Sequence, residues 1–299
     1  MTLDAARHAE RAVRLSRGGT ARRSMPIATL SEVRIRYDLS GHGDPTVLLH
    51  GSLVDRRTWD MVRPGLAQSL TVLVYDRRGH GESTGPPREH PVRDDAGDLA
   101  GLLEAIDLFP VHLIAHSYAG AVALRLAMDR PEMVRSLTIH EPMFFGVLED
   151  DPATAPEADR LAEGVRSMRS LVRDGHPDLA VREVMDSLST EEGGWSRLPT
   201  GVQQGLLRLA DRWAEELGDP ESTHPDPTAF TDLLIPVLLT TGERSPPFLQ
   251  RIVAGTAARL RNATLRTLPG VGHVPHLADP NQFIALIHGF LVERNVPFT

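Results

Sequence analysis

The sequence predicts an α/β protein whose mostly parallel sheet is covered by helices on both faces. Two observations lead to this fold class. The first is that short apolar runs typical of buried strands recur along the chain. The second is that segments with apolar residues at helical spacing separate these runs, as the crossover connections between parallel strands require. The chain has 299 residues, 41% of them hydrophobic, which is enough to bury one large core.

Each predicted strand is a short apolar or alternating run that ends in turn residues. The predicted strands cover residues 33–37, 46–50, 70–76, 111–114, 134–140, 236–241 and 263–268. The fold is expected to begin near Ile27, and residues 40–43 are expected to turn the chain after the first strand. Helices are predicted after Trp59, over 92–108, 122–128 and 247–260, and from Pro280 to about Arg294.

One long segment interrupts this alternation. Residues 142–235 contain no convincing strand but carry two apolar stripes at helical spacing, one over 161–172 and one over 206–217. We predict a basic N-terminal extension over residues 1–25, an α/β core made of 26–141 and 236–299, and a helical lid over 142–235 that covers the carboxyl edge of the sheet. A second interacting domain is the other interpretation of 142–235, which its small size disfavours.

Composition and charge exclude several classes of function. The formal net charge of −8 argues against nucleic acid as a partner. Because the sequence contains no cysteine and no lysine, thiol nucleophiles, thiolate metal sites and Schiff-base chemistry are excluded. No apolar run approaches the ~18 residues of a membrane span, and the first 25 residues lack the apolar segment of a signal peptide. We therefore expect a cytoplasmic protein that does not bind a membrane.

The stretch over residues 111–120 joins a strand to a helix through a tight turn with Ser117 at its apex. The residues two before and two after it, Ala115 and Ala119, are small, as the strained turn of a nucleophile elbow requires. An ordinary strand–helix junction with a capping serine would look similar. The interpretation therefore depends on whether the rest of the chain supplies what a nucleophilic serine needs.

A nucleophilic serine needs a base and two donors for the oxyanion that its attack creates. His273 follows a late strand within Gly-Val-Gly-His, where the glycines let the loop reach inward, and His276 is its main rival among the 13 histidines. The donors are predicted to be the backbone N–H groups of Tyr118 and Ser52, with Leu53 next.

Four motifs occur in order along the chain: His50-Gly51-Ser52, Asp76-x-Arg78-Gly79-x-Gly81-x-Ser83, Ala115-His-Ser-Tyr-Ala-Gly120 and Gly270-Val-Gly-His273. With these motifs the chain resembles the α/β-hydrolase superfamily from about residue 27 to residue 294. The resemblance implies an α/β-hydrolase fold with Ser117 as nucleophile. It leaves the substrate open.

The sequence departs from the superfamily at the acid of the triad. Most members carry an Asp three residues beyond the Gly that ends the strand after the lid, and here that position is Ser245, which cannot support an imidazolium. Haloalkane dehalogenases and zearalenone-type lactone hydrolases instead carry a Glu after the strand that follows the elbow helix, and Glu141 stands there. We predict Glu141 as the acid, with Glu243 as the rival. A residue that caps the first lid helix is the other interpretation of Glu141.

The identity of the nucleophile narrows the range of possible reactions. Related dehalogenases and epoxide hydrolases carry an Asp where Ser117 stands. Plant-type hydroxynitrile lyases that resemble this fold use a lysine, which the chain lacks. We therefore predict hydrolysis of a small-molecule ester or lactone, of medium size and mainly apolar, by a carboxylesterase or lactonase without metal or organic cofactor. The alternatives are a non-hydrolytic enzyme of the same fold (a lyase, cyclase or cofactor-free haloperoxidase) and a receptor-like binder.

The predicted substrate-binding residues are apolar and lie in the oxyanion loop or the lid. They are Leu53, Met143, Phe144, Phe145, Trp195 and Trp213. Packing within the lid itself is the other interpretation of the aromatic residues.

Overall fold

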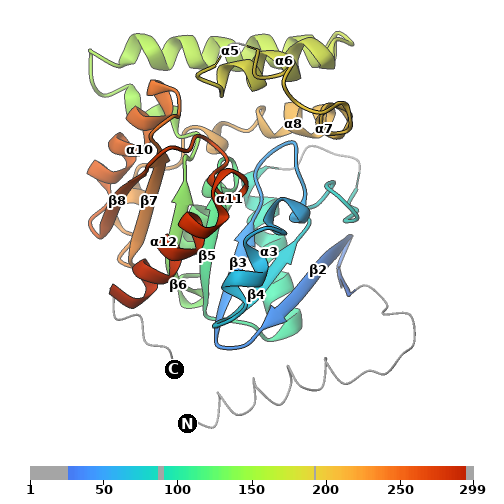
Figure 1. Cartoon of the computed structure of the whole chain (residues 1–299), viewed down its shortest axis with the longest axis vertical. Coiled ribbons are helices and arrows are strands. Elements are labelled where there is room, and N and C mark those ends of the chain that lie inside the picture. The colour runs from blue at the N-terminus through green and yellow to red at the C-terminus, as the bar shows by residue number, and fades with distance from the viewer. Residues whose placement is uncertain (1–25, 87–90, 192, 294–299) are drawn as a thin grey trace.

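The computed structural model describes residues 26–86, 91–191 and 193–293. An eight-stranded sheet with the order β1-β2-β4-β3-β5-β6-β7-β8 forms its centre (Figure 1). The strands are β1 (Ile27–Leu30), β2 (Val33–Gly41), β3 (Asp44–Leu49), β4 (Leu70–Tyr75), β5 (Val111–His116), β6 (Val134–His140), β7 (Val237–Gly242) and β8 (Ala263–Leu268). The predicted basic extension over residues 1–25 lies outside the described residues.

The sheet is parallel from β4 through β8, as the sequence predicts. Only the first two strands run antiparallel to their neighbours. The turn expected over residues 40–43 is shorter than predicted, because Ser40 and Gly41 continue β2 by pairing with Val72 and Thr71. The ladder of main-chain hydrogen bonds outweighs the turn preference of these residues.

Helices cover both faces of the sheet (Figure 1). On one face α3 (Val92–Ile106), α4 (Ala119–Asp129) and α10 (Pro247–Arg259) pack with sheet residues such as Val47 and Leu113. On the other face α12 (Pro280–Glu293) packs with the next residues along the same strands, Leu48 and Ile114. Successive residues of a buried strand point to opposite faces, so an apolar run without alternation supplies both cores.

The helix expected after Trp59 is only partly present. Trp59 ends a short 3-10 turn, η1 (Arg56–Trp59), and a four-residue helix, α2 (Arg63–Leu66), follows. Trp59 itself is fully buried, where its ring packs against Phe283.

Residues 142–235 hold no strand among those that the structure describes. This helical insertion contains η3 (Phe145–Leu148), α5 (Ala155–Arg173), α6 (Pro177–Ser187), α7 (Thr200–Leu207), α8 (Ala210–Glu216), η4 (Pro220–Ser222), α9 (Thr228–Thr231), and then leads into β7. Helices α5 to α8 lie together at one end of the sheet (Figure 1). The stripe over 206–217, predicted as one helix, is divided between α7 and α8, yet Leu206, Ala210 and Trp213 still share one hydrophobic cluster.

No helix in the described ranges has both the length and the apolar character that crossing a membrane requires.

Candidate active site

Ser117 lies at the tight turn between β5 and α4. Its backbone φ is 55°, in the left-handed region that non-glycine residues rarely adopt. The turn is held by the Ser117 N–H, which donates to the His140 carbonyl at 2.9 Å, and by the Gly120 N–H, which donates to the Ser117 carbonyl at 2.9 Å. Ser117 is half-buried and lines a cavity, so its hydroxyl is accessible from a protected space.

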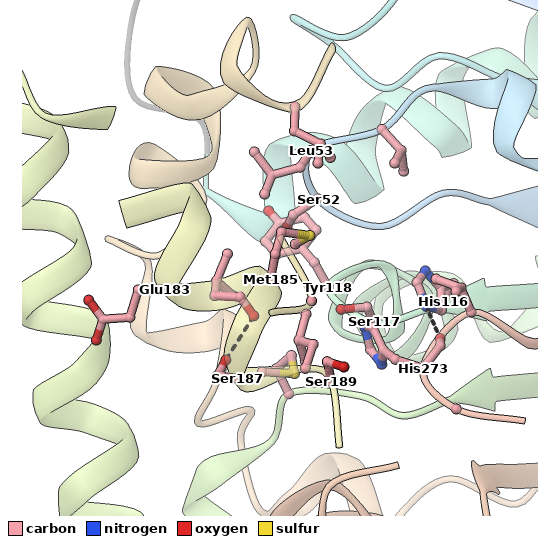
Figure 2. Close-up of a pocket in the computed structure, with 18 of the residues that line it drawn as sticks. Ser52, Leu53, His116, Ser117, Tyr118, Glu183, Met185, Ser187, Ser189 and His273 are labelled. Carbon is pink, nitrogen blue, oxygen red and sulfur yellow. Dashed lines mark hydrogen bonds between the residues drawn. The ribbon is translucent and has the colours of Figure 1, made fainter. Parts of the chain in front are cut away.

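His273 lies in the loop after β8 and lines the same cavity (Figure 2). Its Nδ1 is 2.8 Å from Oε2 of Glu141, a buried carboxylate at the end of β6. In the tautomer that donates this hydrogen bond from Nδ1, Nε2 is the basic nitrogen of the ring. A serine, a histidine and a carboxylate thus come from the ends of three different strands.

The Glu141 carboxylate is held by the end of the neighbouring strand. Its Oε1 accepts hydrogen bonds from the Thr241 hydroxyl at 2.7 Å and from the Gly242 N–H at 2.8 Å. Burial alone would raise the pKa of Glu141, but the hydrogen bond with His273 and the nearby His140 outweigh burial and bring the pKa to about 2. Glu141 is therefore ionised at neutral pH, although no part of it is exposed.

The rivals for the acid and the base make other contacts. The exposed Glu243 accepts a hydrogen bond from the Gly270 N–H at 2.8 Å. His276 is fully buried, and its Nε2 lies 2.9 Å from the Thr58 hydroxyl. Ser245, at the position where most of the superfamily carries an Asp, is buried near Glu141, and its hydroxyl makes no hydrogen bond within the described residues.

Three further imidazoles surround His273. Measured between centroids, the His116 ring lies 4.6 Å from the His273 ring and 5.0 Å from the His276 ring. The His140 ring lies 6.0 Å from that of His116 and 6.3 Å from that of His273. Burial, together with neighbouring imidazoles, lowers the pKa of His276 to about 3 and of His116 well below its usual value. Burial likewise lowers the pKa of His140 to about 4. All three are neutral at pH 7, so they pack the site without adding charge.

His116 also fixes the loop that carries His273. Its Nε2 lies 2.7 Å from the His273 carbonyl oxygen, so the ring N–H donates to that carbonyl (Figure 2). Within the described part of the chain, His140, Glu141 and His273 form the only group whose ligand atoms are close enough to share a metal ion. Two of those three atoms already form the short contact between His273 and Glu141.

The loop after β3 approaches the elbow closely. A Cβ on Gly51 would lie 3.0 Å from the His116 carbonyl oxygen and 3.2 Å from Cβ of Ser117, so any larger residue would crowd the elbow at this point. Leu53 has a left-handed φ of 61°, which turns the loop away again. Ser52, the predicted oxyanion donor of this loop, lines the cavity together with Ser117 and Tyr118 (Figure 2).

The cavity has a volume of about 660 Å³ and lies between the strand ends and the helical insertion. Of the predicted substrate-binding residues, Leu53, Met143, Phe145 and Trp213 line it. Phe144 does not, because it is buried in the core, where its ring packs edge-on against Phe230 at 5.9 Å. Trp195 does not line the cavity either, and it packs against the hydrophobic cluster of the insertion. For these two residues the prediction is wrong.

Several wall residues were not predicted. They share an aliphatic or thioether side chain and come mainly from the insertion: Leu161, Val165, Met168, Met185, Leu188, Val202 and Leu206. Leu161, Val165 and Met168 belong to the apolar stripe of α5. The periodicity of that stripe was a usable signal, but it does not say whether a stripe packs against protein or faces a cavity.

Comparison with known proteins identifies the family. Residues 46–286 match the model of the alpha/beta hydrolase family. The chain therefore belongs to this family, as the four sequence motifs imply.

Among solved structures, a thermophilic esterase from Thermogutta terrifontis has a TM-score of 0.72 at 26% identity and covers 91% of this chain and 97% of its own. Est816, described as an N-acyl homoserine lactone degrading enzyme, has a TM-score of 0.72 at 21% identity over 89% of this chain and 100% of its own. Identity at that level supports the fold alone. A relative in Cupriavidus necator, the dihydrolipoyllysine-residue acetyltransferase component of an acetoin cleaving system, is 26% identical over 87% of this chain and 67% of its own.

Proposed function

We propose that this member of the alpha/beta hydrolase family is a serine hydrolase that cleaves an ester or lactone of a medium-sized, mainly apolar small molecule. The observation that carries the proposal is the 2.8 Å contact between His273 Nδ1 and Glu141 Oε2. His273 lines the same cavity as Ser117. A carboxylate that orients a histidine beside an elbow serine is the arrangement that acyl transfer needs. The likeness to an esterase at 26% identity supports the same reaction class.

The proposed reaction runs in two halves. Ser117 Oγ attacks the carbonyl carbon while Nε2 of His273 takes the hydroxyl proton, and the oxyanion that forms accepts hydrogen bonds from the N–H groups of Ser52 and Tyr118. When the intermediate collapses, the alkoxide leaves with the proton from His273, and an acyl-enzyme remains on Ser117. Water, deprotonated by His273, then attacks the acyl carbon, and the bond to Ser117 Oγ breaks as His273 returns the proton to that oxygen and the acid is released. In a lactone the alcohol and the acid stay in one molecule.

The wall of the cavity supports a mainly apolar substrate. Leucine, valine, methionine and phenylalanine side chains from the helical insertion and from α10 surround the space above Ser117, and apolar walls favour an apolar acyl group or ring. We propose accordingly that residues 142–235 form a lid over the site.

A panel of p-nitrophenyl esters tests the nucleophile and the acid together. Ser117→Ala should lower kcat by a factor of about 10⁴ or more, while Ser187→Ala, which alters another serine of the cavity wall, should leave kcat within about twofold. Glu141→Gln should lower kcat by about 10² to 10⁴, because the histidine loses its charge partner. Glu243→Gln should leave kcat within about twofold.

Two outcomes would contradict the proposal. Turnover that persists in Ser117→Ala would remove the serine from the mechanism. A wild type that neither cleaves any ester nor is labelled by serine-directed phosphonates would favour a receptor-like binder instead.

A further inference from the structure

We propose that Glu216, in α8 of the helical insertion, is a positioning residue that holds the oxyanion loop in its working shape. The inference rests on the proposed function, since it concerns the donor that Ser52 supplies there. Glu216 does not line the cavity and, within the described residues, makes no hydrogen bond or ion pair with Ser117 or His273, so its effect on the reaction is indirect.

Glu216 makes two short hydrogen bonds, one to the oxyanion loop and one to Arg77 in the loop after β4. Its Oε2 accepts from the Ser52 hydroxyl at 2.5 Å, and its Oε1 accepts from Nη2 of Arg77 at 2.6 Å. The side chains of Glu216 and Arg77 are completely buried. A carboxylate is rarely fully buried unless it is paired. Because hydrogen bonds to a charged group are strong and directional, the two partners hold the Glu216 carboxylate in one position.

Arg77 fixes the two peptide groups that precede Ser52. Its Nε donates to the His50 carbonyl at 3.1 Å, and its Nη2 donates to the Gly51 carbonyl at 3.0 Å. The carbonyl of Gly51 and the N–H of Ser52 belong to one planar trans peptide, in which they point in opposite directions. Holding the Gly51 oxygen toward Arg77 therefore directs the Ser52 N–H away from Arg77.

The same arginine contacts the residue that carries the second proposed donor. The guanidinium carbon of Arg77 lies 4.5 Å from the centre of the Tyr118 ring. The Tyr118 hydroxyl donates to Oδ2 of Asp95 at 3.2 Å, and Nη1 of Arg77 donates to the same oxygen at 2.8 Å. Arg77 thus contacts Tyr118 and the peptide group that joins Gly51 to Ser52, and the two proposed oxyanion donors belong to this peptide group and to Tyr118.

Glu216 supplies one of the two carboxylates that pair with the fully buried Arg77, and Asp95 supplies the other. Asp95 is shared with Arg212, whose Nη2 lies 3.4 Å from Oδ2, and Arg212 also pairs with the partly exposed Glu215 at 3.1 Å. The nearby His80 adds no charge, because burial and Arg77 lower its pKa well below the usual value. Removal of the Glu216 charge leaves the buried guanidinium of Arg77 with Asp95 as its one remaining carboxylate partner among the described residues, and Arg212 shares that partner. The conformation of the oxyanion loop therefore depends on α8 packing in its observed position.

The experiment compares Glu216→Gln and Ser52→Ala with a matched control. Glu221→Gln is the control, because Glu221 is another carboxylate of the insertion that pairs with a core arginine, Arg125, at 3.1 Å. Each protein is assayed for kcat and KM on a p-nitrophenyl ester, for the Kd of a trifluoromethyl ketone transition-state analogue, and for Tm. The double variant of Ser52 and Glu216 is included.

We expect Glu216→Gln to lower kcat about tenfold or more with KM within about threefold, and to weaken the analogue by a similar factor. Ser52→Ala removes the same hydrogen bond from its other end and should lower kcat by a smaller factor. The double variant should be no slower than Glu216→Gln alone, because both changes break one contact. Glu221→Gln should keep kcat within about twofold, whatever its Tm.

A folded Glu216→Gln with wild-type kcat and wild-type analogue affinity would overturn the inference. If that variant does not fold, Ser52→Ala decides in its place, and wild-type values for it would overturn the inference as well. A wild type that phosphonates do not label at Ser117 would refute the proposed function and this inference together. If phosphonates label Ser117 in the wild type while Glu216→Gln and Ser52→Ala keep the wild-type kcat, the inference alone is refuted.

Discussion

Glu141 combines two properties that rarely occur in one residue. It is completely buried yet ionised, and its backbone has a left-handed φ of 46°. The backbone conformation of a non-glycine residue in this region costs free energy, which surrounding contacts must offset. Here the Thr241 hydroxyl, the Gly242 N–H and the His273 ring supply those contacts.

The pKa of Glu141 predicts a pH dependence of stability. Because the folded-state value of about 2 lies below the ordinary 4.5, the stabilisation is complete above about pH 4.5 and is lost as the pH falls toward 2. A shift of this size corresponds to roughly 3 kcal/mol at most. The difference in free energy of unfolding between wild type and Glu141→Gln should therefore shrink between pH 5 and pH 3 in urea titrations. A difference that stays constant over this range would contradict the assignment of the low pKa.

At the residue scale the sequence supplies the reactive groups but not their supports. Ser117, His273 and Glu141 each end a predicted strand or follow one, so the topology of a parallel sheet brings them to one edge. Arg77 and Glu216 are 139 residues apart, and Arg77 occupies a variable position of its motif. No local pattern shows which buried carboxylate an arginine will meet across such a separation.

At the scale of elements, α4 packs unusually close to the end of β6. A Cβ on Gly120 would lie 2.7 Å from Cγ2 of Ile139 and 3.0 Å from Cβ of Pro142. Pro142 directly follows Glu141, so the distance between this helix and this strand also sets the position of the proposed acid.

Gly120→Ala should therefore destabilise the protein by about 1–3 kcal/mol through overpacking and should also lower kcat. The matched control is Gly97→Ala, in the interior of α3, where a Cβ would meet nothing within 4 Å. That change should stabilise the protein by up to about 1 kcal/mol, because alanine favours a helix over glycine. Urea unfolding measures both, and equal effects of the two substitutions would contradict the packing argument.

Element boundaries were predictable where periodicity alone decides them. The range of β6 agrees with the predicted 134–140, and α10 ends one residue before the predicted 260. Tertiary contacts decide the exceptions. Pairing with β4 lengthens β2. Helix α7 ends at Leu207 and α8 begins at Ala210, although Leu206 and Trp213 lie in the same hydrophobic cluster.

At the scale of the whole molecule, the cavity is a space that neither the core nor the insertion encloses alone. Gly164 of α5 lines this space, and a Cβ there would meet nothing within 4 Å. A larger side chain at this position would extend into open volume and would not clash with the protein.

Gly164→Leu should consequently shift selectivity by chain length. We expect kcat/KM for p-nitrophenyl decanoate to fall about tenfold, while that for the butyrate stays within about twofold, because only the longer acyl chain reaches α5. Gly164→Ala, which adds little volume, serves as the control and should change neither value by more than about twofold. A uniform loss across all chain lengths would indicate damage to the site and would contradict this account of the cavity.

The two hydrogen bonds from the end of β7 to Glu141 have an evolutionary consequence. The strand that bears the acid in most of the superfamily here binds a carboxylate that its neighbour carries, and Ser245 stands at the position of that acid. What the imidazole of His273 requires is a negative charge at one point in space, and two adjacent strand ends can each deliver it. A lineage can therefore transfer the carboxylate from one strand to the other through an ancestor that carried both, without moving the histidine or the serine.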